Sequence, residues 1–175
     1  MSNSPDSDAS ARPSAMLLTQ EKPLSGMKEY ESALDHVLAL ALGRIRIFER
    51  RLTRAYNAVP RIEIMRNLLL ANQANRIAIV VHDADNIRRD CPRLVVLQRQ
   101  FGHAVAIHRT QSIARGVYDP FCIADGSHYT RRFHYNATRG VLALNDPERA
   151  GDLVQRFQEI WEVSQPAVTG TTLGL

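Results

Sequence analysis

An almost continuous run of β-branched residues, from Arg76 to His82, constrains the fold more than any other feature of this chain. A strand with apolar side chains on both sides is buried on both faces of its sheet, as in sheets that helices cover on each side. Further strands are predicted at 44–48, 104–108, 118–124, 129–135 and 141–144 from their alternating or apolar patterns. We therefore predict a mixed β-sheet with 76–82 near its centre.

Amphipathic helices separate these strands. Apolar residues recur at helical spacing over 29–42 and again over 62–69. A third helix is predicted to begin at Pro92 and to end at Gly102, because proline favours the first turn of a helix and glycine its end. The last helix opens at 146–148 with Asp-Pro-Glu, a typical helix start. This order of elements predicts an α/β fold, a mixed β-sheet flanked by helices.

Length and composition indicate a single domain. The chain has 175 residues, of which 45% are hydrophobic, enough to bury a substantial core. Residues 1–25 are rich in Ser, Pro, Asp and Ala and are expected to form a disordered N-terminal arm, followed by one domain at 26–164 and a flexible tail at 165–175. No segment shows the pattern of a secretory signal or approaches the roughly 20 apolar residues of a membrane span. The expected location is the cytoplasm.

Cysteine content and charge exclude some classes of protein and leave others open. Cys91 and Cys122 are the two cysteines, and no CxxC spacing occurs, so neither a disulfide framework nor a metal site is predicted. We predict no cofactor. The net charge of +4 fits a uniformly solvated surface as well as a nucleic-acid interface.

One segment carries a motif-like arrangement. Residues 118–129 read as a strand, a turn at Asp125-Gly126 and the start of a second strand, and an amphipathic helix ending near Trp161 follows. This layout resembles the C-terminal part of a phospholipase D-like half-domain of the HKD type, whose HxKxxxxD motif supplies a histidine nucleophile, a phosphate-binding lysine and an aspartate. The resemblance covers roughly 45–163. It also points to an uncharacterised bacterial family with this fold.

The motif is incomplete in this chain. Counting back from Asp125 places Tyr118 at the histidine position and Pro120 at the lysine position. A phenol with a pKa near 10 is a poor nucleophile at neutral pH, and proline carries no charge. We interpret the chain as a non-catalytic phospholipase D-like domain that acts as a binding or interaction module in the bacterial cytosol. Whether any catalysis survives stays open, and family precedent implies a homodimer.

A rebuilt catalytic site is the alternative. Asp125, His128 and His134, with His108 nearby, are candidates for acid, base or nucleophile in a phosphoesterase that uses Arg132 to bind phosphate. Each has a simpler structural explanation. Asp before Gly in a turn commonly bonds its own backbone, and each histidine is explained by a local hydrogen bond on a half-exposed strand.

A basic run offers a phosphate-binding surface. Arg131, Arg132 and Arg109 are the candidate phosphate ligands, since guanidinium groups bind phosphate in a bidentate manner. Their alternative role is to charge a strand edge and so prevent aggregation between sheets. The predicted partner is therefore either another protein or a phosphate-bearing ligand such as nucleic acid. The sequence does not decide between the two.

Two aspartates follow the strand at 76–82. Asp83 and Asp85 lie where open α/β sheets bind ligands, and carboxylates are ligands that Mg²⁺ prefers. A loop that caps the next helix explains Asp85 and Asn86 without an ion, and we prefer this explanation. No metal site is predicted.

Overall fold

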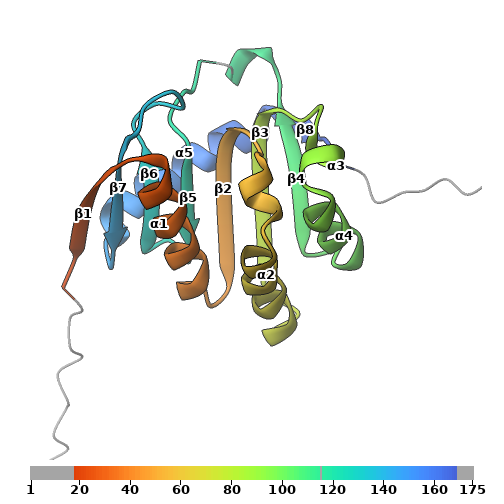
Figure 1. The fold of residues 1–175 in the computed structure, drawn as a ribbon, viewed down its shortest axis with the longest axis horizontal. Coiled ribbons are helices and arrows are strands. Elements are labelled where there is room, and N and C mark those ends of the chain that lie inside the picture. Colours follow the sequence, from red (N-terminus) through yellow and green to blue (C-terminus); the bar gives the residue numbers. More distant parts are fainter. Residues whose placement is uncertain (1–17, 115, 169–175) are drawn as a thin grey trace, which may run out of the picture.

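The computed structural model describes residues 18–114 and 116–168. In this part of the chain an eight-stranded sheet is covered on one face by the four α-helices between residues 27 and 100 and on the other face by the helix at 147–162 (Figure 1). The fold class predicted from the sequence is confirmed. The strands are β1 (Gln20–Ser25), β2 (Arg44–Arg51), β3 (Arg76–Asp83), β4 (Val105–Thr110), β5 (Phe121–Ala124), β6 (His128–Arg132), β7 (Arg139–Leu144) and β8 (Ser164–Pro166). The helices are α1 (Met27–Leu40), α2 (Val59–Ala71), α3 (Ile87–Asp90), α4 (Pro92–Gln100) and α5 (Pro147–Glu162), with short 3₁₀ turns η1 (Arg54–Asn57) and η2 (Ser112–Ala114).

Strand directions distinguish the two ends of the strands in the sheet. The order is β1-β7-β6-β5-β2-β3-β4-β8, and β2, β3 and β4 are parallel while the other pairs are antiparallel. The carboxyl ends of these parallel strands therefore meet at one edge, which we call the carboxyl edge. Because β5 is antiparallel to β2, the chain before Phe121 lies at the carboxyl edge and the turn after Ala124 lies at the opposite edge.

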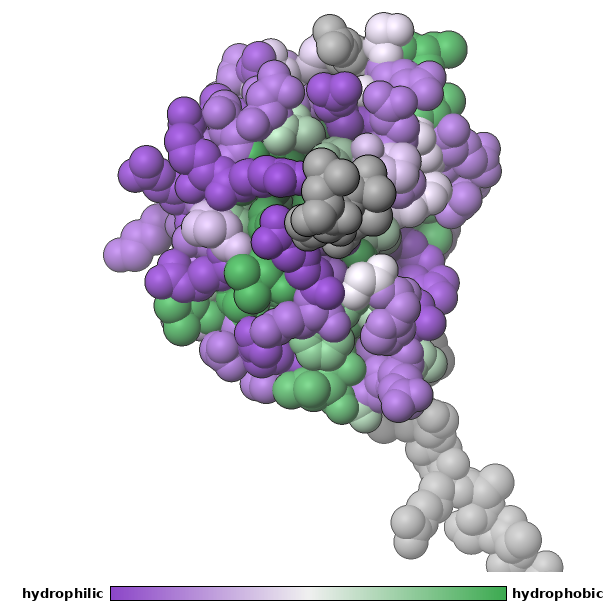
Figure 2. All heavy atoms as spheres, turned by 90° about the vertical axis from the view of Figure 1, so that its right-hand side faces the viewer, coloured by the Kyte–Doolittle hydropathy of each residue, from purple (hydrophilic) through white to green (hydrophobic). Residues whose placement is uncertain are grey.

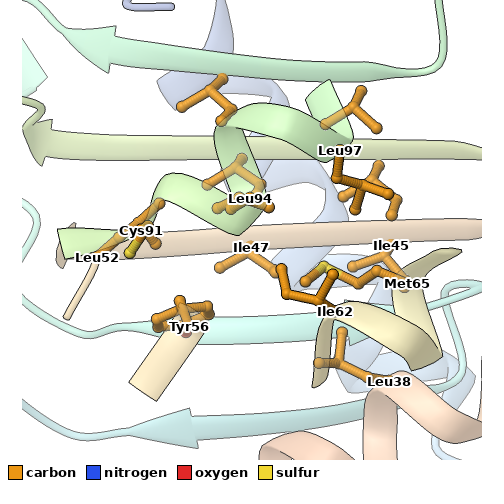
Figure 3. Close-up of a cluster of buried hydrophobic side chains, with 14 of the residues drawn as sticks. Leu38, Ile45, Ile47, Leu52, Tyr56, Ile62, Met65, Cys91, Leu94 and Leu97 are labelled. Atoms are coloured by element: carbon orange, nitrogen blue, oxygen red, sulfur yellow. The ribbon is translucent and has the colours of Figure 1, made fainter. Parts of the chain in front are cut away.

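The larger part of the core lies between the sheet and helices α1, α2 and α4. Alternation in β2 turns Ile45 and Ile47 toward these helices, where they pack against Ile62 and Met65 of α2 and Leu94 of α4 (Figure 3). All five side chains are buried. Helix α2 is nearly apolar on the side that faces the sheet, so its position over β2 and β3 follows from the burial of that surface.

A second core lies under α5. Phe48 of β2 and Phe121 of β5 face this helix and contact Phe157 and Ile160. The Asp146 side chain caps α5 by accepting a hydrogen bond from the Arg149 backbone amide at 3.2 Å, as the Asp-Pro-Glu start predicts. Each face of the central strands is thus covered, which explains the continuous apolar run of β3.

Both termini of the described chain contribute strands that the sequence did not reveal. Gln20–Ser25 were expected in a disordered arm but form β1, which pairs with β7 along its whole length and buries Leu24. Ser164–Pro166, at the start of the expected tail, form β8 against β4. Long-range backbone pairing orders both segments despite their polar composition. The rest of the expected arm, 1–17, and of the tail, 169–175, lies outside the described residues.

The surface at the β4–β8 edge is mainly hydrophilic, with hydrophobic residues in separate patches (Figure 2). Across the described ranges, every helix is too short or too polar to cross a membrane.

Candidate functional site

Two adjoining cavities lie at the carboxyl edge. The Glu49 cavity, of about 340 Å³, lies between α1 and the end of β2 and is lined by residues that include Tyr30, Glu49 and Arg132. The Tyr118 cavity, of about 320 Å³, opens at the ends of β2, β3 and β4. Its lining residues are Arg50, His82, Asp83, Asp85, Arg109, Tyr118 and Tyr135. Three of these, Arg50, Asp83 and Tyr135, line both cavities, which therefore form one cleft.

Glu49 is a buried carboxylate held by three donors. It follows Ile45 and Ile47 on the same face of β2 and is only 4% exposed. Its Oε1 accepts hydrogen bonds from the Tyr56 hydroxyl at 2.9 Å and the Tyr30 hydroxyl at 3.3 Å. The Arg132 guanidinium donates to Oε2 at 3.3 Å. The negative charge is thus compensated inside the domain.

Burial dominates the acid–base chemistry of this cluster. It raises the pKa of Glu49, while the charge of Arg132 and the hydrogen bonds from the tyrosines act in the opposite direction. The pKa of Tyr30 and of Tyr56 is raised well above the ordinary value, by burial first and by the nearby Glu49 second. Both phenols therefore stay protonated at neutral pH and serve as hydrogen-bond donors, not as nucleophiles.

The aromatic rings of Tyr118 and Tyr135 line the Tyr118 cavity, and His134 packs against both of them. The ring centroids of Tyr118 and His134 are 5.5 Å apart, and His134 stacks on Tyr135 at 4.4 Å. The guanidinium carbon of Arg50 lies 4.3 Å from the centroid of the Tyr135 ring on its face, a cation–π contact. Tyr118 is 48% exposed, so part of its ring is open to a ligand.

His82 is fixed in place by both ring nitrogens. Nε2 lies 2.7 Å from the Val117 carbonyl oxygen, so it must carry the proton and donate. Nδ1 lies 2.7 Å from the Thr110 hydroxyl and, in the neutral ring, accepts from it. The edge of the ring packs against Phe48 with centroids 5.1 Å apart. His82 therefore ties the loop before β5 to β3 and β4.

Two aspartates, Asp83 and Asp85, also line the Tyr118 cavity. The Asp83 carboxylate accepts a hydrogen bond from the Asp85 backbone amide at 3.0 Å and so closes the turn before α3. Asn86, at the start of α3, makes no capping bond with its side chain. Asp85 pairs with Arg109 at 3.6 Å. Within 18–114 and 116–168, no group of three or more His, Cys, Asp or Glu side chains is placed to hold a metal ion.

Three arginines converge on Asp90 beside this cleft. Arg89 bonds the carboxylate through two nitrogens, at 3.1 and 3.3 Å, and the guanidinium groups of Arg51 and Arg54 each lie 3.8 Å away. The hydrogen bond from Arg89 lowers the pKa of Asp90, as do the charges of the three arginines. The arginine side chains are 47%, 86% and 68% exposed for Arg51, Arg54 and Arg89, whereas Asp90 is 9% exposed. A surplus of positive charge therefore faces solvent.

Asp125 lies at the edge of the sheet opposite the cleft. Its carboxylate accepts hydrogen bonds from the backbone amides of Leu42 at 2.6 Å, Gly43 at 2.9 Å and Arg44 at 2.7 Å. The residue has a φ of 51°, in the left-handed region that a tight Asp-Gly turn uses. Asp125 therefore lies in the predicted turn. Its carboxylate, however, bonds the chain at 42–44, between α1 and β2, and not the backbone of its own turn.

The structure does not bring the three candidate histidines together. His128 is next to the Asp125 turn, where Nδ1 accepts from the Asn145 backbone amide at 3.1 Å. His134 lies beyond the other end of β6, beside Tyr118. His108 is on β4, where it stacks on Trp161 at 3.8 Å and contacts the Ser164 hydroxyl at 3.0 Å, and burial lowers its pKa.

The three candidate phosphate-binding arginines lie in different places. Arg132 points into the core and pairs with Glu49. Arg131, on the opposite face of β6, pairs with Asp119 at 2.9 Å and is 35% exposed. Arg109 lies in the Tyr118 cavity and is 44% exposed. Successive residues of a strand point to opposite faces, so Arg131 and Arg132 cannot grip one phosphate.

The alternation of β2 contains a signal for one residue of the cleft, Glu49. Glu49 continues the alternation of Ile45 and Ile47, which places a carboxylate on a buried face and requires a partner there. Arg51 and Arg54 belong to a run of basic residues in the sequence that also includes Arg50. Their convergence on Asp90 depends on how α3 packs beside β2, a long-range contact that no local pattern reports.

Comparison with known proteins supports the fold assignment. Nuc from Salmonella typhimurium, a phospholipase D family member, superimposes with a TM-score of 0.62 and 14% identity over 85% of this chain and 98% of its own. NucT from Helicobacter pylori gives a TM-score of 0.57 and 12% identity over 85% and 99%. TrmBL2, described as an archaeal chromatin protein with a novel mode of DNA binding, gives 0.61 and 13% over 84% and 54%. At such low identity these matches show the fold alone.

No curated protein matches this sequence. A family model does match residues 27–170, which include all the described helices and most of the strands. The chain therefore has a phospholipase D-like fold and belongs to the family described as Domain of unknown function (DUF7931).

Proposed function

We propose that this domain is a non-hydrolytic binding module that holds a nucleic-acid strand at the carboxyl edge of its sheet. The observation that carries the proposal is the convergence of Arg51, Arg54 and Arg89 on the single carboxylate of Asp90. Three guanidinium groups around one buried acid leave net positive charge at the surface. Guanidinium groups pair with phosphate oxygens through parallel hydrogen bonds, so this cluster fits a phosphate backbone.

The positions of the motif residues support binding without hydrolysis. Tyr118 stands at the position of the motif histidine and lies in the cleft, where its phenol offers no imidazole nitrogen. Pro120 stands at the lysine position and is buried. His82 is the imidazole that lines the cleft, and both its nitrogens already lie 2.7 Å from protein oxygens. TrmBL2, whose description reports DNA binding, has the same fold.

The alternative function, a phosphoesterase with a rebuilt site, receives less support. It requires Asp125, His128, His134 and Arg132 to act on one substrate. Asp125 and His128 lie at one end of the β5–β6 hairpin and His134 at the other, and Arg132 is engaged by Glu49 inside the core. These four groups do not face a common space.

A salt titration of strand binding tests the proposal. Affinity for a fluorescent single-stranded oligonucleotide is measured by anisotropy over a range of salt concentrations. Each phosphate contact on a single strand contributes about 0.7 to the slope of log affinity against log salt. We expect the double variant R51A/R54A to lower the magnitude of that slope by about 1.4 and to weaken binding at low salt.

Arg99→Ala is the matched control for this experiment. Arg99 is exposed at the end of α4, at the edge of the sheet opposite the cleft. Its removal should leave the slope unchanged. Salt-independent binding by the wild type, or an equal loss in the control variant, would contradict the proposal. Catalytic turnover of a generic phosphodiester that disappears in His134→Ala would favour the phosphoesterase instead.

A further inference from the structure

The Tyr118 cavity has the size and position of a pocket for a single base. Its volume of about 320 Å³ lies at the small end of the range for small-molecule sites, about 300 to 1,000 Å³. Such a volume is sufficient for one planar heterocycle. Arg51 of the arginine cluster lines the Glu49 cavity, which adjoins the Tyr118 cavity. A strand held by that cluster therefore passes the mouth of the pocket.

One wall of the pocket is a stacking surface. The rings of Tyr118 and Tyr135 line the pocket with centroids 5.9 Å apart, and Arg50 covers Tyr135. Among the described residues the Tyr118 hydroxyl has no hydrogen-bond partner, and the side chain is about half exposed. The Arg50 guanidinium likewise has no carboxylate within 4.0 Å in the described part of the chain. Stacking on such rings is available to any base.

The same pocket is also lined by hydrogen-bond acceptors, the carboxylates of Asp83 and Asp85. One oxygen of Asp83 closes the turn to Asp85, and the other makes no hydrogen bond to the described protein. A carboxylate accepts from the exocyclic amino group of a base, as acidic side chains do with cytosine. Guanine offers two adjacent N–H donors, which suit one carboxylate in a bidentate manner. Thymine presents carbonyl oxygens on both sides of its one N–H, and these oxygens repel the carboxylate.

We propose that the Tyr118 cavity binds one unpaired nucleobase with an exocyclic amino group, guanine foremost. The base stacks on Tyr118 beside Tyr135, and its donors bond Asp83. This inference rests on the proposed function, because the arginine cluster delivers the strand to the pocket. Phosphate contacts alone do not depend on the base sequence. The pocket adds a preference for particular bases to that function.

The stacking contact is tested with two substitutions at one position. Tyr118→Phe keeps the ring and should bind a strand of about 12 nucleotides as the wild type does. Tyr118→Leu removes the aromatic face and should weaken binding by about 5- to 100-fold. Because no phosphate contact is lost, the salt slope of Tyr118→Leu should equal that of the wild type. In R51A/R54A the slope should fall.

Base preference is tested with thymidine strands that carry a single dG, dC or dA at the centre. The wild type should bind the dG strand about tenfold more tightly than the strand of thymidine alone. Asp83→Asn can still close the turn, since asparagine makes the same type of turn, but it replaces an acceptor with an amide. The preference for dG should then fall to within about twofold.

The outcomes separate the two proposals. Salt-dependent binding with equal affinity for all four strands, or with no effect of Tyr118→Leu, overturns the base pocket and leaves the phosphate-binding function standing. Absence of binding to every strand overturns both. A dG preference that vanishes in Asp83→Asn, with an unchanged salt slope, supports both.

Discussion

At the scale of single residues, this domain contains two kinds of carboxylate: those whose oxygens all bond the protein and one that keeps a free oxygen in the cleft. Glu49 and Asp125 are both fully engaged by the protein, the first by side-chain donors in the core and the second by backbone amides at the far edge. Asp83 keeps an unengaged oxygen and lies in the cleft. Residue type alone does not distinguish these roles, because the partners come from distant parts of the chain.

Glu49 should control the stability of the domain. Glu49→Ala leaves the Arg132 guanidinium buried without its partner, a change that costs about 3 to 5 kcal/mol in the free energy of unfolding. Urea denaturation measures this loss. The control is Glu63→Ala, because Glu63 makes only an exposed contact to Arg66 at 3.7 Å and should change stability by less than about 1 kcal/mol. Similar losses in both variants would show that the buried cluster does not stabilise the fold.

The raised pKa of Glu49 also predicts a pH dependence. Burial raises its pKa above the ordinary value of 4.5, so the native state holds the proton more tightly than the unfolded chain. The stability that this proton adds is fully present below the unfolded pKa and is lost as the pH rises through the folded pKa. The wild type minus Glu49→Gln difference in unfolding free energy should therefore fall from acidic toward neutral pH. A constant difference would contradict this expectation.

Asp125 should affect stability and not ligand binding. Asp125→Ala removes the acceptor of three backbone hydrogen bonds and should cost about 2 kcal/mol, measured by urea denaturation. Asp125→Asn should lose less, because asparagine keeps one acceptor oxygen and tolerates the left-handed φ. Both variants should bind a single strand like the wild type. Loss of binding in a stably folded Asp125→Asn would assign this residue to the site after all.

At the scale of elements, β1 illustrates how pairing overrides composition. Its residues are polar and mostly exposed, and Leu24 is the member buried, against Tyr30 and Ala33 of α1. Sequence patterns recognised the strands and helices of the interior because their apolar periodicity is strong. They did not recognise β1 or β8, because the order of these edge strands comes from backbone hydrogen bonds to β7 and β4.

Leu24 should anchor β1 to the domain. Leu24→Ala removes the main apolar contact of the strand and should lower the free energy of unfolding by about 2 to 3 kcal/mol. Thermal denaturation followed by circular dichroism measures the effect. Leu18→Ala serves as the control, since Leu18 is 81% exposed and should leave the midpoint unchanged. If the two variants unfold at the same temperature, β1 is not held by this contact.

At the scale of the whole molecule, the carboxyl edge gathers the ends of several elements into one cleft. Parallel strands β2, β3 and β4 end there, and β5 begins there, so side chains far apart in the sequence become neighbours. The sequence alone placed the aspartates after β3 at this edge. The homodimer and the cytoplasmic location implied by the resemblance and the composition stay predictions.

The sequence by itself determined the interior elements, their order and the fold class, because apolar periodicity and helix starts are local signals that a buried sheet requires. It also determined that Tyr118 and Pro120 occupy the motif positions. Only the tertiary structure decided which charged groups meet: Arg132 with Glu49, Asp125 with the 42–44 amides, and three arginines with Asp90. Each of these contacts joins different elements. Their partners are set by how helices pack on the sheet and by which strands are neighbours, and neither is encoded in a short stretch of chain.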